Sequence, residues 1–258
     1  MQTTFYKYQG TGNDFILIDN RSGSFPKENH ALISQWCHRR FGIGADGLIL
    51  LEDDAQTDFK MVYFNADGHE GSMCGNGGRC IVAFAAHLDL IDGNTTFNAV
   101  DGLHKAIISD GSVELNMKDV ATVKPKEKAI FLDTGSPHHV QLVEGLEDMD
   151  VPREGARLRY GLYGKAGSNI NFVSQLGPNR FQVRTYERGV EDETLSCGTG
   201  VTAVALAMDH LGYSSASELE IKTAGGPLTV KFERSGAGYS NIHLSGPAQQ
   251  IFKGIISW

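Results

Sequence analysis

Two short stretches decide the fold of this chain: Cys74-Gly75-Asn76-Gly77-Gly78 and Cys197-Gly198-Thr199-Gly200-Val201. Both follow the pattern Cys-Gly-x-Gly, and their first residues stand 123 positions apart, since 197 − 74 = 123. The same separation aligns other short matches: Thr11-Gly12 with Thr134-Gly135, Gly44-Ala45-Asp46 with Gly167-Ser168-Asn169, Tyr63 with Tyr186, Glu70 with Glu193, and His87-Leu88 with His210-Leu211. Self-similarity at one separation indicates an internal duplication.

The duplication predicts two domains of like fold. We expect an N-terminal domain over residues 1–117 and a C-terminal domain over residues 118–248, with the polar stretch 118–128 at their junction. An apolar tail, residues 249–258, lies beyond the second repeat. We expect this tail to return to the N-terminal domain and add a strand there.

Hydrophobic patterning predicts a similar series of elements in each repeat. The helix that follows each cysteine motif is apolar almost all round, so its own sheet should enclose it. Asp110-Gly111 is typical of a tight hairpin turn. The expected strands are 4–8, 15–18, 48–51, 60–64, strand pairs across 95–116, and 218–232; the expected helices are 27–40, 78–88 and 200–211.

Composition and charge exclude several classes of protein. The chain has 258 residues with 31 acidic against 23 basic side chains, so its net charge of −8 does not suit a nucleic-acid binder. It contains no apolar run long enough to span a membrane, and its first residues lack the pattern of a secretory signal, so we expect a cytoplasmic protein.

The sequence predicts neither a metal site nor a nucleotide cofactor. The four cysteines form no Cys-x-x-Cys pair, and the adjacent His138 and His139 should point to opposite sides of a strand. Gly42–Gly47 matches Gly-x-Gly-x-x-Gly, but a predicted helix precedes it and a strand follows. That order is the reverse of a dinucleotide-binding turn.

The two cysteine motifs suggest acid–base chemistry. Each cysteine stands just before a helix, where unpaired N–H groups and the helix dipole favour a thiolate and also welcome a carboxylate ligand. Two thiols at equivalent places suit the inversion of a carbon stereocentre, in which one group removes a proton and the other delivers one to the opposite face. The remaining cysteines, Cys37 and Cys80, lie on apolar helical faces and are expected in the core.

Several motifs together resemble the diaminopimelate epimerase family, in order and over nearly the whole chain. That resemblance implies an α/β (α+β) fold of two homologous domains, each a curled mixed sheet around a central helix. It implies an isomerase without pyridoxal phosphate, metal or other cofactor. Such an enzyme interconverts LL- and meso-diaminopimelate for lysine and peptidoglycan synthesis, usually as a cytoplasmic homodimer. The motifs are Gly10-Thr11-Gly12-Asn13-Asp14-Phe15, Asn65-Ala66-Asp67-Gly68, residues 73–80, Glu187-Arg188-Gly189 and residues 193–200.

The resemblance also implies roles for individual residues. Cys74 and Cys197 are similar to the family's acid–base pair, and His138 and Glu187 to the neighbours that tune the two thiols. Two positions depart from the pattern: Ser136 stands where many members carry Asn, and Gly47 where some carry Gln. The implied substrate ligands are Asn13, Asn65, Asn169, Glu187 and Arg188, with the helix-start pairs Gly75-Asn76 and Gly198-Thr199.

Two other functions are compatible with the same residues. One is a racemase or isomerase of another small molecule in the same superfamily. Proline and hydroxyproline racemases tend to carry His after the cysteine's glycine, where this chain has Asn76 and Thr199. The other is a duplicated ligand-binding protein without catalysis, although binding alone requires the helix-start amides and not two thiols.

Overall fold

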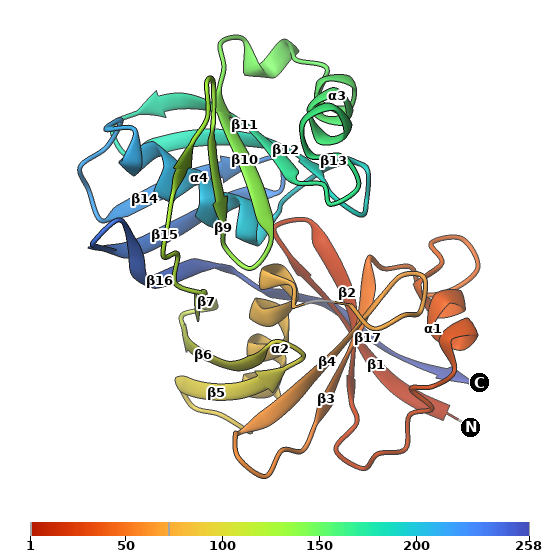
Figure 1. The fold of residues 1–258 in the computed structure, drawn as a ribbon. Coiled ribbons are helices and arrows are strands. Elements are labelled where there is room, and N and C mark those ends of the chain that lie inside the picture. The colour runs from red at the N-terminus through yellow and green to blue at the C-terminus, as the bar shows by residue number, and fades with distance from the viewer. Residues whose placement is uncertain (1, 72, 258) are drawn as a thin grey trace. The chain divides into compact units, whose positions relative to one another are not determined.

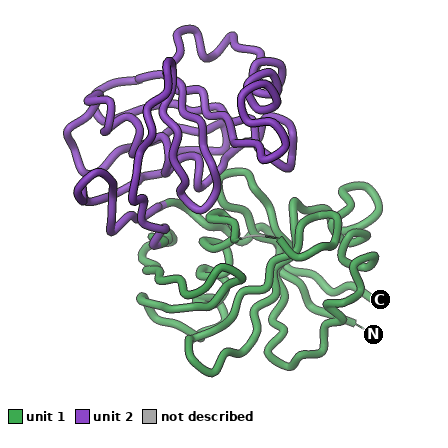
Figure 2. The backbone as a smooth tube through the Cα atoms, in the orientation of Figure 1, with its two compact units in different colours: residues 1–115, 246–258 green, residues 116–245 purple. Residues whose placement is uncertain are grey.

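The computed structural model describes residues 2–71 and 73–257, and the chain divides into two compact units (Figures 1 and 2). Unit 1 comprises Met1–Leu115 together with Gly246–Trp258, and unit 2 comprises Asn116–Ser245. Among the described residues, the strands of each unit form a mixed β-sheet, and each unit has two α-helices. Within the described residues, no helix has the length and apolar character needed to cross a membrane.

The sheet of unit 1 is built around two parallel steps. Strands β2 and β3 run parallel and are joined through helix α1 (His30–Cys37), whereas β4 and β5 run parallel and are joined through α2 (Gly75–His87). The other neighbours are antiparallel. In spatial order the strands are β17 (Gln249–Ser257), β1 (Gln2–Gly10), β2 (Asn13–Asp19), β3 (Gly47–Glu52), β4 (Phe59–Asn65), β5 (Asn94–Ala99), β6 (Gly102–Ser109) and β7 (Ser112–Asn116).

Unit 2 repeats this plan. Its parallel steps are β10–β11, joined through α3 (Val151–Tyr163), and β12–β14, joined through α4 (Gly198–His210). A 3₁₀ turn, Leu146–Asp148, precedes α3, and the short strand β13 (Asp192–Thr194) folds back on the end of β12. In spatial order the strands are β8 (Lys124–Pro125), β9 (Ile130–Asp133), β10 (Pro137–Leu142), β11 (Asn169–Gly177), β12 (Arg180–Glu187), β14 (Glu218–Thr223), β15 (Gly226–Ser235) and β16 (Gly238–Pro247).

Several elements and turns of the two units correspond at the separation of 123. Helices α2 and α4 begin and end at equivalent positions, 75–87 and 198–210. Left-handed backbone recurs at equivalent turns, with φ of 85° and 108° at one pair and 80° and 68° at another: Gly12 with Gly135, and Gly44 with Gly167. The predicted fold class, two homologous mixed sheets from a duplication, is therefore confirmed.

The helices after the cysteines are enclosed by their sheets. Residues 75–82 of α2 and 200–209 of α4 are buried throughout, and α4 packs against six strands of its unit. Both helices begin earlier than the sequence predicted, at Gly75 and Gly198. Their first-turn glycines are helical and allow close packing: a Cβ on Gly200 would lie 2.5 Å from Asn171 Oδ1.

Helix α1 is shorter than the predicted 27–40. The side chain of Asn29 accepts a hydrogen bond from the backbone N–H of Leu32, which fixes the first turn at His30. The backbone becomes extended at His38, with φ −67° and ψ 120°, and this ends the helix. The Asp110-Gly111 turn has positive φ at both residues and joins β6 to β7, as predicted.

Candidate active site

The two candidate sulfurs occupy the same structural position in their units. Cys74 precedes the first residue of α2 with φ −110° and ψ 121°, and Cys197 precedes the first residue of α4 with φ −122° and ψ 110°. Backbone N–H groups of the first helical turn have no acceptor within their own helix, and the positive end of the dipole lies there. Each sulfur therefore stands where a thiolate or a bound carboxylate is stabilised.

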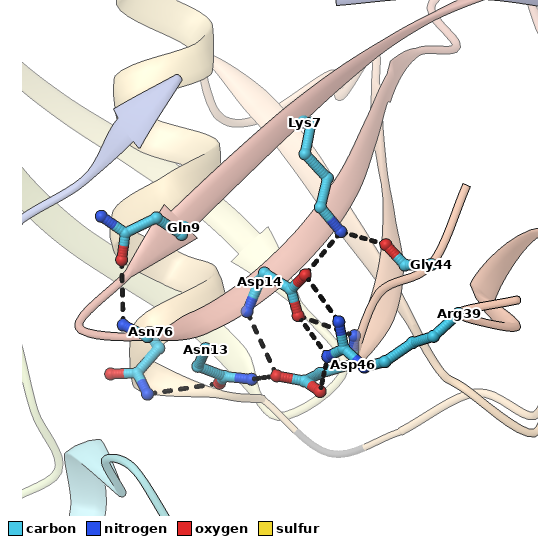
Figure 3. Close-up of polar contacts among 9 residues, drawn as sticks. Lys7, Gln9, Asn13, Asp14, Arg39, Gly44, Asp46 and Asn76 are labelled. Carbon is cyan, nitrogen blue, oxygen red and sulfur yellow. Dashed lines mark hydrogen bonds and ion pairs between the residues drawn. The ribbon is translucent and has the colours of Figure 1, made fainter. Parts of the chain in front are cut away.

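The thiol of Cys74 is bonded to an asparagine whose orientation is fixed. Cys74 Sγ donates to Asn13 Oδ1 over 3.5 Å, and Asn76 Nδ2 donates to the same oxygen over 3.2 Å. The other end of the Asn13 amide, Nδ2, donates to Asp46 Oδ2 at 2.6 Å (Figure 3). Because a carboxylate only accepts, Asn13 must turn its oxygen toward the thiol.

A cluster of alternating charges supports Asp46. Arg39 Nη2 lies 2.6 Å from Asp46 Oδ1 and 2.7 Å from Asp14 Oδ1. Lys7 pairs with Asp14 Oδ2 at 2.7 Å and also donates to the carbonyl of Gly44 (Figure 3). Burial alone would raise the pKa of Asp14, but the bonds from Arg39 and Lys7 outweigh it and lower that pKa to about 2.

The sulfur of Cys197 faces a hydroxyl group instead. Thr199 Oγ1 lies 3.5 Å from Cys197 Sγ and 2.9 Å from His138 Nε2. The backbone carbonyl of Thr199 accepts from Thr134 Oγ1 at 2.8 Å, which holds the first turn of α4 against the end of β9. Burial, assisted by the charge of Arg188, lowers the pKa of His138 to about 3, so its ring is neutral.

The neighbours of His138 determine its tautomer. Asn171 Nδ2 lies 3.0 Å from the carbonyl oxygen of His139, which only accepts, and 3.1 Å from His138 Nδ1. Thr185 Oγ1 donates to the amide oxygen of Asn171 at 3.0 Å. Asn169 Nδ2 lies 3.5 Å from His138 Nε2, so an NH₂ group faces each ring nitrogen, and the shorter contact, from Asn171 to Nδ1, places the ring proton on Nε2. An Nε2 proton is directed to Thr199 Oγ1, which leaves the hydroxyl hydrogen of Thr199 available to Cys197 Sγ.

The adjacent histidine faces the other way, as predicted. His139 bonds to Tyr163 Oη at 2.9 Å and to Gln141 Oε1 at 3.2 Å. Among the residues that the structure describes, no group of histidine, cysteine and acidic side chains is arranged to hold a metal ion.

Two predicted substrate ligands, Asn169 and Arg188, lie together in unit 2 with Ser136, which departs from the family pattern. Asn169 Nδ2 donates to Ser136 Oγ at 3.0 Å, and Asn169 Oδ1 accepts from the backbone N–H of Arg188 at 2.8 Å. The guanidinium of Arg188 is exposed and reaches Ser136 Oγ at 3.4 Å. Glu187, the last residue of β12, accepts a bond from Thr194 Oγ1 at 2.8 Å.

Asn65 is exposed at the end of β4, directly opposite Gly47 on β3. A Cβ at residue 47 would lie 2.5 Å from the carbonyl oxygen of Phe64 and 2.5 Å from a ring carbon of Tyr63. The glycine at this position is therefore required by the packing, because Tyr63 occupies the space that a longer side chain would take.

The remaining cysteines belong to the core, as predicted. Cys37 and Cys80 are buried, and burial raises the pKa of each thiol to about 12. Both are therefore neutral thiols without a role as proton acceptors at ordinary pH.

Sequence reasoning missed two supporting residues, Asp46 and Asn171. The separation of 123 offered a signal for the first, because it aligns Asp46 with Asn169. The same separation aligns their partners, Asn13 and Ser136, and the structure pairs each set. No sequence pattern marked Asn171, which acts through its neighbour on β10.

The fold is found in other proteins. A phenazine biosynthesis protein of the PhzF family from Bacillus anthracis shares the fold over the full length of both chains, with a TM-score of 0.78 at 13% identity. A hydroxyproline epimerase from Agrobacterium vitis has a TM-score of 0.68 at 14% identity, over 99% of this chain and 92% of that one. At such identities these similarities show the fold alone.

Sequence similarity is far stronger to one family. The family model described as diaminopimelate epimerase matches the chain twice, over residues 5–123 and 130–251. The diaminopimelate epimerase of Flavobacterium psychrophilum is 58% identical over 250 residues, covering 96% of this chain and 98% of the relative. That of Chlorobaculum tepidum is 42% identical, covering 96% and 99%. The chain belongs to the diaminopimelate epimerase family and is an isomerase.

Proposed function

We propose that this protein interconverts LL- and meso-2,6-diaminopimelate, in lysine and peptidoglycan biosynthesis, by a two-cysteine mechanism without a cofactor. The observation that carries the proposal is the duplicated placement of Cys74 and Cys197 at the starts of equivalent buried helices. Family membership supports the substrate, since the relatives at 58% and 42% identity are named for it.

The proposed chemistry needs one base and one acid at the same α-carbon. One sulfur, as a thiolate, takes the α-proton, and the other, as a thiol, gives its proton to the opposite face. The amides of Gly75-Asn76 and Gly198-Thr199 would hold the α-carboxylate, whose charge suits a helix start. After one turnover the proton and the charge have changed places between the sulfurs.

The substrate ligands are proposed to select the second amino-acid end of diaminopimelate. Arg188 is suited to a carboxylate because its planar guanidinium binds one through two parallel hydrogen bonds. Asn13, Asn65, Asn169 and Glu187 supply further polar groups. A substrate without the second amino-acid end would leave polar groups unpaired and should be rejected strongly.

Isotope labelling tests the two-base mechanism. In heavy water, early product should carry deuterium at the inverted centre while the unreacted substrate remains unlabelled. Replacing Cys74 or Cys197 by Ala should lower turnover about 10²- to 10⁴-fold. Cys37→Ala is the matched control, because that thiol lies in the core and should leave turnover nearly unchanged. Equal early labelling of substrate and product would contradict the two-base mechanism.

A substrate panel tests the assignment separately. LL-diaminopimelate, lysine, glutamate, histidine and hydroxyproline are compared at equal concentration. Only diaminopimelate should be inverted at an appreciable kcat/KM. A comparable value for any of the others would overturn the substrate while leaving the mechanism intact.

We further propose that the enzyme works in the cytoplasm as a homodimer, with no nucleic-acid or membrane partner. The acidic net charge of −8 supports the exclusion of nucleic acids. Light scattering coupled to size-exclusion chromatography measures the mass directly, and a mass of one 28.0 kDa chain at micromolar concentration would contradict the dimer.

A further inference from the structure

The two sulfurs stand at equivalent positions but have side-chain partners of opposite character. At Cys74 one partner is an amide oxygen, which accepts, and at Cys197 one partner is a hydroxyl group, which is able to donate. Because the helix starts are equivalent in both units, the helix dipole acts similarly on each sulfur. The difference between the two thiols must then come from the side chains around them.

At Cys74 the amide oxygen favours the protonated sulfur. Asn13 Oδ1 accepts a hydrogen bond from a thiol but places a partial negative charge beside a thiolate. Asn13 is unable to turn its NH₂ group toward the sulfur without breaking its 2.6 Å bond to Asp46. Asp46 therefore acts on the sulfur of Cys74 through Asn13, by fixing which end of the Asn13 amide faces that sulfur.

At Cys197 the chain of donors favours the charged sulfur. The 3.1 Å contact of Asn171 Nδ2 with His138 Nδ1 is shorter than the 3.5 Å contact of Asn169 Nδ2 with Nε2, and it places the ring proton on Nε2. That N–H occupies an acceptor position of Thr199 Oγ1 at 2.9 Å. The hydroxyl hydrogen of Thr199 is then directed at Cys197 Sγ, 3.5 Å away. A donated hydrogen bond stabilises a thiolate more than a thiol, since bonds to ionised groups are about twice as strong.

Charged groups near each sulfur also contribute. The pairs around Asp46 balance, since Asp46 and Asp14 face Arg39 and Lys7. Arg79, which is fully buried on α2, interacts with the charge of Cys74 and works in favour of its thiolate.

In unit 2 the charge of Arg188 acts on His138, and burial keeps the His138 ring neutral, so the ring places no charge beside Thr199. The charge of Arg79 favours a thiolate at Cys74, whereas the hydrogen bonds at the two sulfurs favour a thiolate at Cys197.

We propose that in the substrate-free protein Cys197 carries the negative charge and Cys74 carries the proton, and that Asp46 and Asn171 are the positioning residues that set this difference. One consequence of this inference rests on the proposed function: the free enzyme is ready for the isomer whose α-hydrogen faces Cys197. The protonation states themselves belong to the free protein and are measured without a substrate.

The primary experiment is alkylation of the wild-type protein by iodoacetamide across a range of pH, with each cysteine followed by peptide mass spectrometry. The midpoint of each rate profile reports the thiolate fraction, and unequal access to the two sulfurs changes only the plateau. The midpoint for Cys197 should lie at least about one pH unit below that for Cys74, a tenfold difference in acidity. Equal midpoints, or a lower midpoint for Cys74, would overturn the proposal and identify Arg79 as the dominant influence.

Two variants test the role of Asp46. Asp46→Asn allows the Asn13 amide to turn and donate to the sulfur, so the midpoint for Cys74 should fall. Asp14→Asn removes an equal charge from the same cluster without touching the Asn13 side chain, and should shift the midpoint much less. Equal shifts would show a simple charge effect and would refute the positioning role.

The tautomer of His138 is a separate measurement on the unmodified protein. ¹⁵N chemical shifts of the imidazole nitrogens, assigned by their loss in His138→Asn, should show a neutral ring protonated at Nε2 near neutral pH. A ring protonated at Nδ1, or at both nitrogens, would overturn the donor chain to Cys197. A turnover defect with correct shifts and midpoints would count against the proposed function and leave this inference standing.

Discussion

Replacing Thr199 by Val tests the connection between His138 and Cys197 with a change of almost no volume. The substitution exchanges one hydroxyl group for a methyl group. That hydroxyl lies 3.5 Å from Cys197 Sγ and 2.9 Å from His138 Nε2, so both contacts are lost together. The backbone amide at residue 199, which would hold the substrate carboxylate, is unchanged.

The expected magnitude follows from the bond to the charged sulfur. A hydrogen bond to an ionised group contributes about 1.5–3 kcal/mol, which corresponds to a loss of about 10- to 150-fold in kcat/KM. The length of the sulfur contact places the expectation toward the lower end. The variant also leaves the buried Nε2–H of His138 without an acceptor, which should lower the free energy of unfolding by about 1–3 kcal/mol.

Initial rates on LL-diaminopimelate, with a thiol reductant present, measure the catalytic effect. Thermal unfolding confirms that the variant is folded at the assay temperature. Thr202→Val is the matched control in the same helix, because Thr202 Oγ1 donates only to the helix carbonyl of Gly198, at 3.0 Å. The kcat/KM of Thr202→Val should stay within about threefold of the wild-type value. This substitution removes one neutral hydrogen bond of about 1 kcal/mol, between groups that take no part in the reaction.

Two results would refute this reasoning. If Thr199→Val retains kcat/KM within about threefold, and the alkylation midpoint of Cys197 does not rise, the hydroxyl group does not act on the sulfur. If Thr202→Val loses as much activity as Thr199→Val, damage to helix α4 explains both losses and the connection to His138 is unnecessary.

Three further predictions concern stability and cofactors. Gly47→Ala should lower the free energy of unfolding by about 1–3 kcal/mol, because the new Cβ meets the backbone of Phe64. Gly161→Ala in helix α3 places its Cβ in open space and should raise that free energy by about 0.5–1 kcal/mol. An unchanged melting temperature for Gly47→Ala would contradict the packing argument. Burial lowers the pKa of His138 to about 3, so the unfolded chain binds a proton that the folded chain excludes, and stability should fall as the pH drops from 6.5 toward 3. His138→Asn should reduce that slope by up to about 1.4 kcal/mol per pH unit in urea unfolding, and an unaltered slope would show that the ring is not neutral in the folded state. EDTA should leave the epimerisation rate unchanged, and inhibition reversed by zinc would contradict a metal-free mechanism.

The duplication was readable from the sequence because short motifs kept one separation. Cys74 and Cys197 anchored that separation, and the structure places both at helix starts. The helix starts themselves were predicted too late, at residues 78 and 200, because glycines are normally signals for loops. In the fold, Gly75 and Gly198 are helical, and in the same turns Gly77 and Gly200 allow side chains of neighbouring strands, Ile49 and Asn171, to approach closely.

The polar partners of the sulfurs were harder to predict. Asp46 is connected to Cys74 through Asn13, and Asn171 is connected to Cys197 through His138 and Thr199. The second connection depends on the parallel register of β10 and β11, in which Asn169 lies beside His138 and Asn171 follows on the same face. A single sequence contains the residues of such a hydrogen-bonded chain but does not show which of them are neighbours in space.

Divergence between the two repeats has a chemical reason in a reaction that inverts one carbon. Inversion needs a base on one side and an acid on the other at the same moment, whereas two identical environments would favour the same protonation state in both thiols. The equivalent positions 13 and 136 hold Asn and Ser, and the equivalent positions 76 and 199 hold Asn and Thr. These small differences leave both helix starts intact and change which atom faces each sulfur. A duplicated fold thus supplies two matched carboxylate-binding helix starts, and a few substitutions between the copies are enough to make one thiol differ from the other.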